Sequence, residues 1–192
     1  MNSQMGFYYD QTRCIGCYTC AIACKDWHDV HESCVNWMQI QNIEKGKFPN
    51  LFMAYLAVPC YHCEEPSCMR ACPEDAIYKR EGDGIVLVDP DKCTGKDVCK
   101  KTPCLAACRT KSPQFGSEKD AKMQKCDFCL DRLTAGQQPI CVEACPMFAL
   151  EIDTLVKLKI KHGEEKETVG FPYSKKIKQA SIFKPKPVVY NP

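Results

Sequence analysis

The chain has 192 residues, a formal net charge of +2 and seventeen cysteines. Its basic and acidic residues nearly balance, which excludes the strongly basic surface expected of a nucleic-acid-binding protein. Cysteines in this number require an explanation as disulfides or as metal ligands. The N-terminal stretch lacks the basic and apolar regions of a signal peptide, so we expect a reducing compartment and thiols that bind metal. No apolar run approaches the roughly eighteen residues that would span a membrane.

Sixteen of the cysteines form four groups of four, called quartets 1 to 4 in chain order. They are Cys14, Cys17, Cys20 and Cys24; Cys60, Cys63, Cys68 and Cys72; Cys93, Cys99, Cys104 and Cys108; and Cys126, Cys129, Cys141 and Cys145. Quartet 1 has the spacing C-x2-C-x2-C-x3-C, by which bacterial-type ferredoxins hold [4Fe–4S] clusters. Every quartet ends in C-x3-C, and residues so spaced lie on one side of a helix. We therefore expect a helical turn that directs each last thiolate toward a neighbouring cluster.

Short strands are expected around the quartets. Residues 6–10, 51–58 and 85–89 precede quartets 1, 2 and 3, and residues 76–80 and 148–153 follow Pro73 and Pro146, where proline ends the helical turn.

Four further segments have their own patterns. Apolar stretches on both sides of the polar residues 44–50 indicate a β-hairpin, and the EGDG of residues 81–84 indicates a hairpin turn. A short helix is expected to begin near Asp153 or Thr154 and to end at Gly163. The charged, proline-rich remainder has no periodic apolar face, so we expect an extended tail that lies on the chain's own surface or on a partner's.

Some of these residues have alternative interpretations. Quartet 4 alone resembles a zinc ribbon, which keeps a zinc-stabilised scaffold as an alternative. Cys34 lies outside the quartets and is interpreted as a spare thiol. His28 and His31 have the spacing of a weak metal pair without an evident third ligand. Cluster irons ligated only by thiolates leave no open position for a substrate, which argues against catalysis by this chain.

Residues 5–29, 60–89, 125–150 and 182–192 carry a specific resemblance that extends over nearly the whole chain. They resemble the four-cluster iron–sulfur subunits of complex iron–sulfur molybdoenzymes, especially the electron-transfer subunit of dimethyl sulfoxide reductase. The resemblance implies that quartets 1 and 4 share one ferredoxin module and that quartets 2 and 3 share the other.

The resemblance also implies four [4Fe–4S] sites, called A to D. Site A is Cys14, Cys17, Cys20 and Cys145; site B is Cys24, Cys126, Cys129 and Cys141; site C is Cys60, Cys63, Cys68 and Cys108; and site D is Cys72, Cys93, Cys99 and Cys104. Quartet 3 departs from the family pattern, because its first gap is longer and Arg109 stands where proline is common. A [3Fe–4S] centre is therefore an alternative at this quartet.

We expect an α+β fold of two interlocked bacterial-ferredoxin-like modules. Residues 1–34 and 121–162 would form the first module and residues 59–120 the second, with a hairpin-like insertion at 35–58 and an extended tail at 163–192.

The expected function is electron transfer between a molybdenum- or tungsten-pterin catalytic subunit and another redox partner, with a membrane anchor as one candidate for that partner. A polyferredoxin-type subunit of a hydrogenase or of an aldehyde-oxidising complex is the alternative. The expected location is cytoplasmic, or outside the cytoplasm after export in folded form with a partner that bears a twin-arginine signal.

Overall fold

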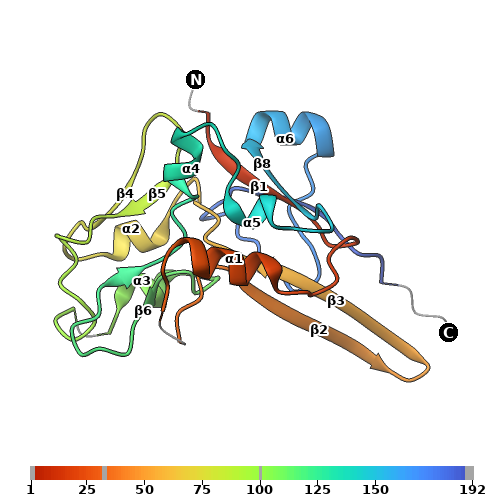
Figure 1. Cartoon of the computed structure of the whole chain (residues 1–192), viewed down its shortest axis with the longest axis horizontal. Coiled ribbons are helices and arrows are strands. Elements are labelled where there is room, and N and C mark those ends of the chain that lie inside the picture. The colour runs from red at the N-terminus through yellow and green to blue at the C-terminus, as the bar shows by residue number, and fades with distance from the viewer. Residues whose placement is uncertain (1–2, 32–33, 100, 189–192) are drawn as a thin grey trace.

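The computed structural model describes residues 3–31, 34–99 and 101–188. It combines short helices with small sheets, as expected for an α+β fold (Figure 1). The strands are β1 (Met5–Asp10), β2 (Gln39–Lys47), β3 (Asn50–Val58), β4 (Ile77–Lys79), β5 (Val86–Val88), β6 (Gln114–Phe115), β7 (Met123–Gln124), β8 (Leu150–Thr154) and β9 (Ser181–Lys184). The helices are α1 (Thr19–Trp27), α2 (Ser67–Ala71), α3 (Pro103–Ala107), α4 (Leu130–Thr134), α5 (Ile140–Glu143) and α6 (Leu155–His162).

One three-stranded sheet joins both ends of the chain. Strand β1 lies in its middle, antiparallel to β8 and parallel to β9. Both faces of β1 are covered, because successive side chains point to opposite faces of a strand. Tyr8 packs with Leu158 and Ile182 under α6, whereas Phe7 and Tyr9 point into the main core. The sheet therefore connects the segment before quartet 1 with the segments that follow quartet 4.

Helices lie at the C-x3-C ends of the quartets, as the spacing predicts. Cys20 and Cys24 lie within α1, and Cys68, Cys104 and Cys141 lie within α2, α3 and α5. Helix α1 lies against α5, and α2 lies against α3. The helix of quartet 1 thus contacts that of quartet 4, and the helix of quartet 2 contacts that of quartet 3.

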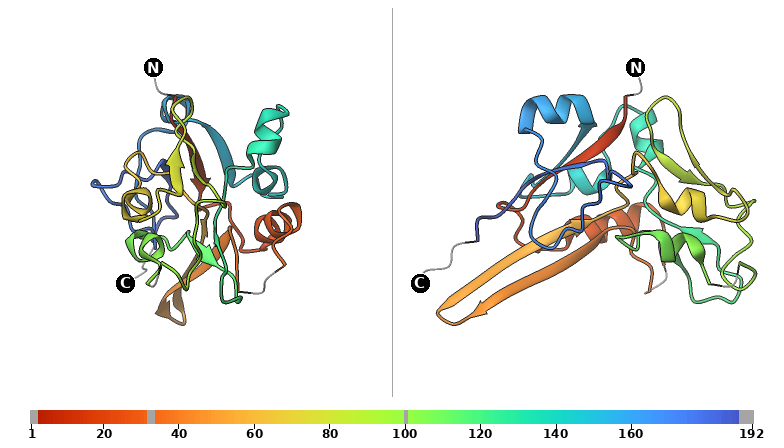
Figure 2. Two further views of the ribbon diagram at one scale, coloured as in Figure 1. Left: turned by 90° about the vertical axis from the view of Figure 1, so that its left-hand side faces the viewer. Right: turned by 180° about the vertical axis from the view of Figure 1, so that it is seen from behind.

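Strands β2 and β3 form a long antiparallel hairpin that extends beyond the rest of the chain (Figure 2). Its base belongs to the core, where Leu56, Ala57 and Val58 are buried. Its tip is exposed, and Phe48 is 94% accessible to solvent.

Most local expectations are confirmed. Strands β1, β3 and β5 precede quartets 1, 2 and 3, and β4 and β8 follow the two prolines. Helix α6 begins after Thr154, whose side chain accepts a hydrogen bond from the backbone N–H of Lys157, and it ends at Gly163. Such a cap satisfies one of the amides that a helix leaves unpaired at its start. Among the described residues, no helix is long and apolar enough to cross a membrane.

The C-terminal segment lies on the chain's own surface, which is one of the two expected alternatives, and several of its side chains enter the core. Phe171, Ile177 and Ala180 are buried, and β9 pairs with β1. The apolar residues of this segment are irregularly spaced because loops separate them, so they show no periodic pattern in the sequence.

Replacing Phe183 by alanine is expected to destabilise the chain by about 3–5 kcal/mol, the usual cost of removing a buried phenylalanine. Phe183 is 1% exposed, and its ring lies 4.4 Å from Phe171 and 6.2 Å from Tyr61 between centroids. Anaerobic urea unfolding measures the change. The matched control is Phe48→Ala at the exposed hairpin tip, where we expect less than about 0.5 kcal/mol. Equal losses in the two variants would contradict the assigned core.

Candidate iron–sulfur centres

Three cavities are each lined by four cysteines from two different quartets. The lining cysteines are Cys14, Cys17, Cys20 and Cys145 in the first; Cys60, Cys63, Cys68 and Cys108 in the second; and Cys72, Cys93, Cys99 and Cys104 in the third. These are the sets that the sequence resemblance implies for sites A, C and D.

The cysteines of site B lie together in the core between α1 and α5. Burial raises the pKa of the Cys24 thiol to about 12, and the nearby Cys129 adds to the increase. Burial likewise raises the pKa of Cys141, and Cys24 and Cys129 raise it further. The pKa of Cys126 is raised by burial and then by Cys24, Cys60 and Cys141. Each of these thiols is therefore close enough to another member of site B to oppose its ionisation.

The same repulsion operates within the cavities. The pKa of Cys20 is raised to about 12, mainly by burial and further by the neighbouring thiols of Cys145, Cys14 and Cys17. Four thiolates in one low-dielectric space are unfavourable unless a cation balances their charge. Soft sulfur donors in this arrangement fit an iron–sulfur cluster, whose irons supply that positive charge.

The spacing of the sulfurs distinguishes a cluster from a single metal ion. With a zinc–sulfur distance of about 2.3 Å, tetrahedral geometry puts the sulfurs about 3.8 Å apart. Within the described part of the chain, the one group of three ligand atoms that lie within 4.8 Å of one another is His28, Asp127 and Cys129. In the described part of the chain no three quartet sulfurs lie within that distance of one another, which does not match the packing of donors around a single zinc ion.

The backbone of the C-x2-C loops has a common conformation. The residue before the second cysteine has a positive φ in three of them: 70° at Gly16, 42° at His62 and 69° at Phe128. Such left-handed residues turn the chain sharply, which lets two closely spaced cysteines point to the same side. In the third loop the N–H of Phe128 donates to the Sγ atom of Cys126 at 3.4 Å. Hydrogen bonds of this kind stabilise thiolate charge on a ligand.

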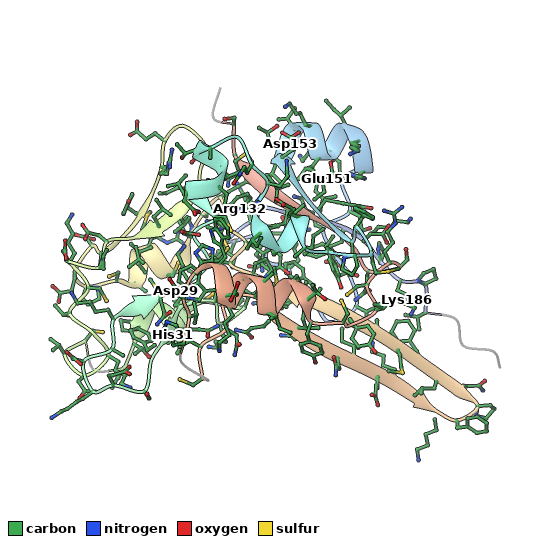
Figure 3. The ribbon with its side chains drawn as sticks, viewed as in Figure 1. Asp29, His31, Arg132, Glu151, Asp153 and Lys186 are labelled. Atoms are coloured by element: carbon green, nitrogen blue, oxygen red, sulfur yellow. The ribbon has the colours of Figure 1, made fainter. Side chains whose placement is uncertain are left out.

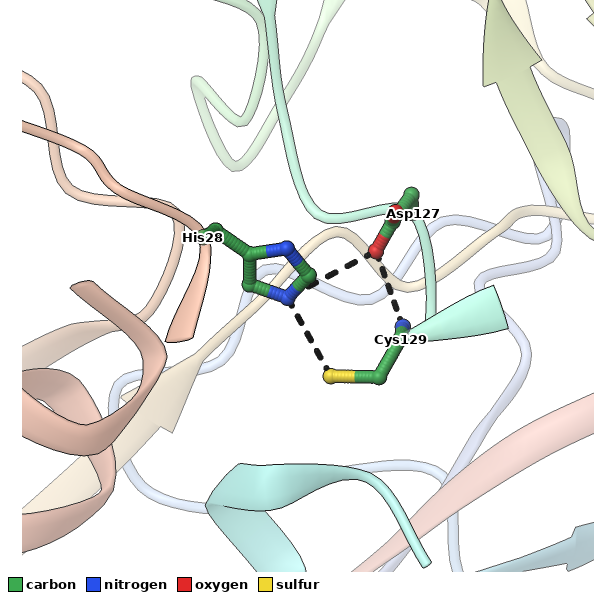
Figure 4. A group of neighbouring side chains, drawn as sticks. All are labelled: His28, Asp127 and Cys129. Carbon is green, nitrogen blue, oxygen red and sulfur yellow. Dashed lines mark hydrogen bonds and ion pairs between the residues drawn. The ribbon is translucent and has the colours of Figure 1, made fainter. Parts of the chain in front are cut away.

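One group of side chains at site B could not be found from the sequence (Figure 4). The Nε2 atom of His28 lies 3.2 Å from the Cys129 Sγ and 3.7 Å from the Asp127 Oδ1. The Asp127 carboxylate also accepts the Cys129 N–H at 2.8 Å. The partners of His28 are thus Cys129 of the site B set and the nearby Asp127, about a hundred residues away in the chain, and not His31.

A second unexpected feature is Arg132 on α4 (Figure 3). Its guanidinium lies 4.4 Å above the ring of Trp27, and it pairs with Glu143. The Trp27 Nε1 donates to the Asp131 carboxylate at 2.8 Å. These contacts connect α1 with α4 and α5, the helices around site B. Cys34, in contrast, is exposed and lies outside the three cysteine-lined cavities.

Comparison with known proteins identifies the family. The 4Fe-4S dicluster domain family matches residues 51–155. The B subunit of the anaerobic dimethyl sulfoxide reductase of Escherichia coli is 39% identical over 193 aligned positions, which cover 96% of this chain and 90% of that protein. A probable anaerobic dimethyl sulfoxide reductase subunit of the same organism matches to the same extent. The thiosulfate reductase electron transfer subunit of Salmonella typhi is 38% identical over 167 positions, which cover 84% of this chain and 81% of that one.

The alignments cover most of the length of each relative, so the similarity concerns the whole subunit and not one motif. Together with four cysteine quartets, it gives the chain four [4Fe–4S] clusters and a role in electron transfer without catalysis of its own. The chain belongs to the 4Fe-4S dicluster family of iron–sulfur electron-transfer subunits, with the B subunit of anaerobic dimethyl sulfoxide reductase among its relatives.

Proposed function

We propose that this chain carries electrons between a molybdenum- or tungsten-pterin catalytic subunit and a second redox partner, through clusters held at sites A to D. The observation that carries the proposal is the convergence of cysteines from two quartets on each of three cavities. When bound, the clusters supply one-electron storage at four points along the chain. The protein supplies the ligands, the order of the sites and the surfaces through which electrons enter and leave.

The ligand sets proposed for the four sites are those defined above. Quartets 1 and 4 would hold sites A and B, and quartets 2 and 3 would hold sites C and D. The contacts of α1 with α5 and of α2 with α3 support this pairing. Residues 1–34 and 121–162 would then form one module and residues 59–120 the other. The modules would be interlocked, because the two segments of the first module lie before and after the second module in the chain. The hairpin of residues 35–58 and the segment 163–192 lie outside the two modules.

Shared elements support the order A, B, C, D. Helix α1 carries Cys20 of site A and Cys24 of site B. Helix α2 carries Cys68 of site C and leads directly to Cys72 of site D. A contact also links the two pairs of sites. The pKa of Cys126 of site B is raised mainly by burial, and Cys60 of site C is close enough to raise it further. The four sites would therefore form a linear array in space, in which A and D each have one neighbouring site and B and C each have two.

Exposed apolar residues surround site A, where the catalytic subunit is proposed to bind. Ile22 on α1 is 67% exposed, and Phe148 beside the cavity is 74% exposed. Cys17 itself is exposed. At the opposite end of the sequence of sites, Val98 is 63% exposed next to Cys99 of site D, where the second redox partner would bind. Exposed apolar residues that lie together are typical of a surface that a partner covers, whereas a single one such as Val98 is common on any surface.

The proposed location is cytoplasmic, and the alternative is export of the folded chain together with a partner that bears a twin-arginine signal. Fractionation of cells that express the native complex, with both the chain and its partner followed, separates the two.

Cys145→Ser and Cys141→Ser are expected to alter different clusters, although both residues belong to quartet 4. Cys145→Ser should change the same electron paramagnetic resonance signal as Cys14→Ser, and Cys141→Ser the same signal as Cys24→Ser. Cys34→Ser serves as the control and should keep about sixteen irons per chain. A single signal that responds to both quartet 4 substitutions would show that the ligands do not cross between sites.

Ile22→Glu is expected to reduce recovery of the catalytic subunit in anaerobic native purification about tenfold, because it puts an unpaired charge into the proposed interface. The matched control is Val156→Glu on α6, where the replaced residue is 63% exposed and lines none of the three cysteine-lined cavities. Both variants should retain their iron. Mass spectrometry of the recovered partner distinguishes a molybdenum or tungsten enzyme from a hydrogenase or an aldehyde-oxidising complex. Equal recovery of the catalytic subunit with the two variants would show that the surface around Ile22 is not the interface.

A further inference from the structure

Lys125 is a buried lysine at the junction of the two proposed modules. Its side chain has a relative exposure of 2% in the folded chain. It follows β7 and directly precedes Cys126, the first site B ligand in quartet 4. Its ammonium group donates to the backbone carbonyl oxygen of Cys126 at 2.9 Å and to that of Val86. Among the described residues, no carboxylate lies within ion-pair distance of it.

The same side chain lines the cavity of site C. Burial raises the pKa of the Cys60 thiol, and Lys125 opposes this both by its charge and by a hydrogen bond. At Cys68 the pKa is raised by burial and by Cys60, and Lys125 again lowers it. The ammonium group therefore faces the sulfurs of site C from a position next to a ligand of site B.

Two other cations lie near site C, but neither is buried as Lys125 is: Arg109 lines the same cavity and is exposed, and Lys79 is half-buried and donates to the Cys63 carbonyl oxygen at 3.2 Å. His62 is fully buried, and burial holds its pKa well below the usual range, with the charge of Lys125 as the second cause. Its Nδ1 accepts the backbone N–H of Val86 at 3.0 Å, which keeps the neutral ring oriented. The ring of Phe128, in the site B loop, packs edge to face against it at 4.9 Å. Of these three cations, Lys125 is therefore the one that is fully buried.

A buried cation without a carboxylate is costly, and two carbonyl groups compensate for only part of the lost hydration. A cubane with four thiolates is an anion in both redox states and gains a further negative charge on reduction. Interactions between charges are strong in a low-dielectric interior, so a nearby cation favours the reduced form. An anionic cluster in the cavity that Lys125 lines would therefore supply the negative charge that stabilises this buried ammonium group.

We propose that Lys125 raises the reduction potential at site C and thereby determines how an electron is shared between the two modules. It acts as a positioning charge and not as a ligand. The inference rests on the proposed function, because it takes Cys60, Cys63, Cys68 and Cys108 as the ligands of one cluster. Its sign follows directly: removal of the cation lowers the potential at site C and shifts the electron toward the other sites.

The test is a redox titration of the native complex, followed by electron paramagnetic resonance, with four lysine variants. Lys125→Met removes the charge at similar length, and Lys125→Gln removes it but keeps a donor for the two carbonyl groups. Lys125→Arg keeps the charge. The matched control is Lys122→Met, which replaces a lysine three positions earlier whose ammonium group binds the Pro90 carbonyl at the surface.

For each neutral variant at position 125 we expect about a tenfold smaller equilibrium constant for one-electron reduction at site C, equivalent to a midpoint about 59 mV lower. Lys125→Arg and Lys122→Met should leave that midpoint near its original value, and all four variants should keep about sixteen irons. The signal of site C is assigned independently as the one that Cys108→Ser alters.

Two outcomes would overturn the proposal. An unchanged site C midpoint in Lys125→Gln with all iron retained would show that the charge has no effect there. A shift confined to a cluster that Cys108→Ser leaves intact would show that Lys125 acts on another site. The ligand sets are tested separately: if Cys108→Ser and Cys60→Ser alter different signals, the proposed function fails at site C whatever the lysine variants do.

Discussion

In this protein, thiols from distant segments share small cavities, and several buried thiols have neighbouring thiols that make their ionisation less favourable. Site A combines cysteines of the first 24 residues with Cys145, and burial with this neighbour raises the pKa of Cys20 to about 12. Such a set of donors is unfavourable as thiolates until irons balance the charge. Assembly of the clusters and folding of the chain are therefore linked, because the same cations that the thiols need also connect the segments that carry them.

The rest of the fold keeps these segments in place. Strand β1 pairs with β8 and β9, so the loop that carries quartet 1 is anchored to the strand after quartet 4 and to the C-terminal segment. Gly6 makes this close packing possible, because a Cβ atom there would lie 2.5 Å from Leu155 Cδ2 and 2.8 Å from the Ala180 carbonyl oxygen. Around site B, Arg132 connects α1 with α5 through Trp27 and Glu143. These contacts position ligands and contribute no ligand themselves.

Charges around the sites distinguish one cluster position from another. His28 contacts Cys129 at site B, and Lys125 faces site C from within the core. Hydrogen bonds and fixed charges of this kind are the means by which a protein adjusts the potential of a cluster whose chemistry is otherwise the same from site to site. The two proposed modules would therefore differ in their surroundings as well as in their cysteine loops, and the longer first gap of quartet 3 adds to that difference.

Much of this was predictable from the sequence, because it depends on residues within about one helical turn of each other. The C-x3-C spacing predicted the helices at Cys20, Cys68, Cys104 and Cys141, Pro73 and Pro146 predicted where they end, and Thr154 and Gly163 predicted the limits of α6. The number and type of the metal donors followed from the quartets alone. The pairing of the quartets, in contrast, came from the family resemblance, since four similar groups can be combined in several ways.

Only the tertiary structure showed which distant residues surround the sites. Nothing in the spacing of His28 predicted Cys129 as its neighbour, and nothing in the residues around Lys125 predicted that it is buried beside site C. The C-terminal segment entered the core without a periodic pattern, because its apolar residues are spaced by loops and find their partners across the chain. Sequence spacing determines local geometry, where the backbone restricts the distances, whereas contacts across a hundred residues are decided by how the whole core packs.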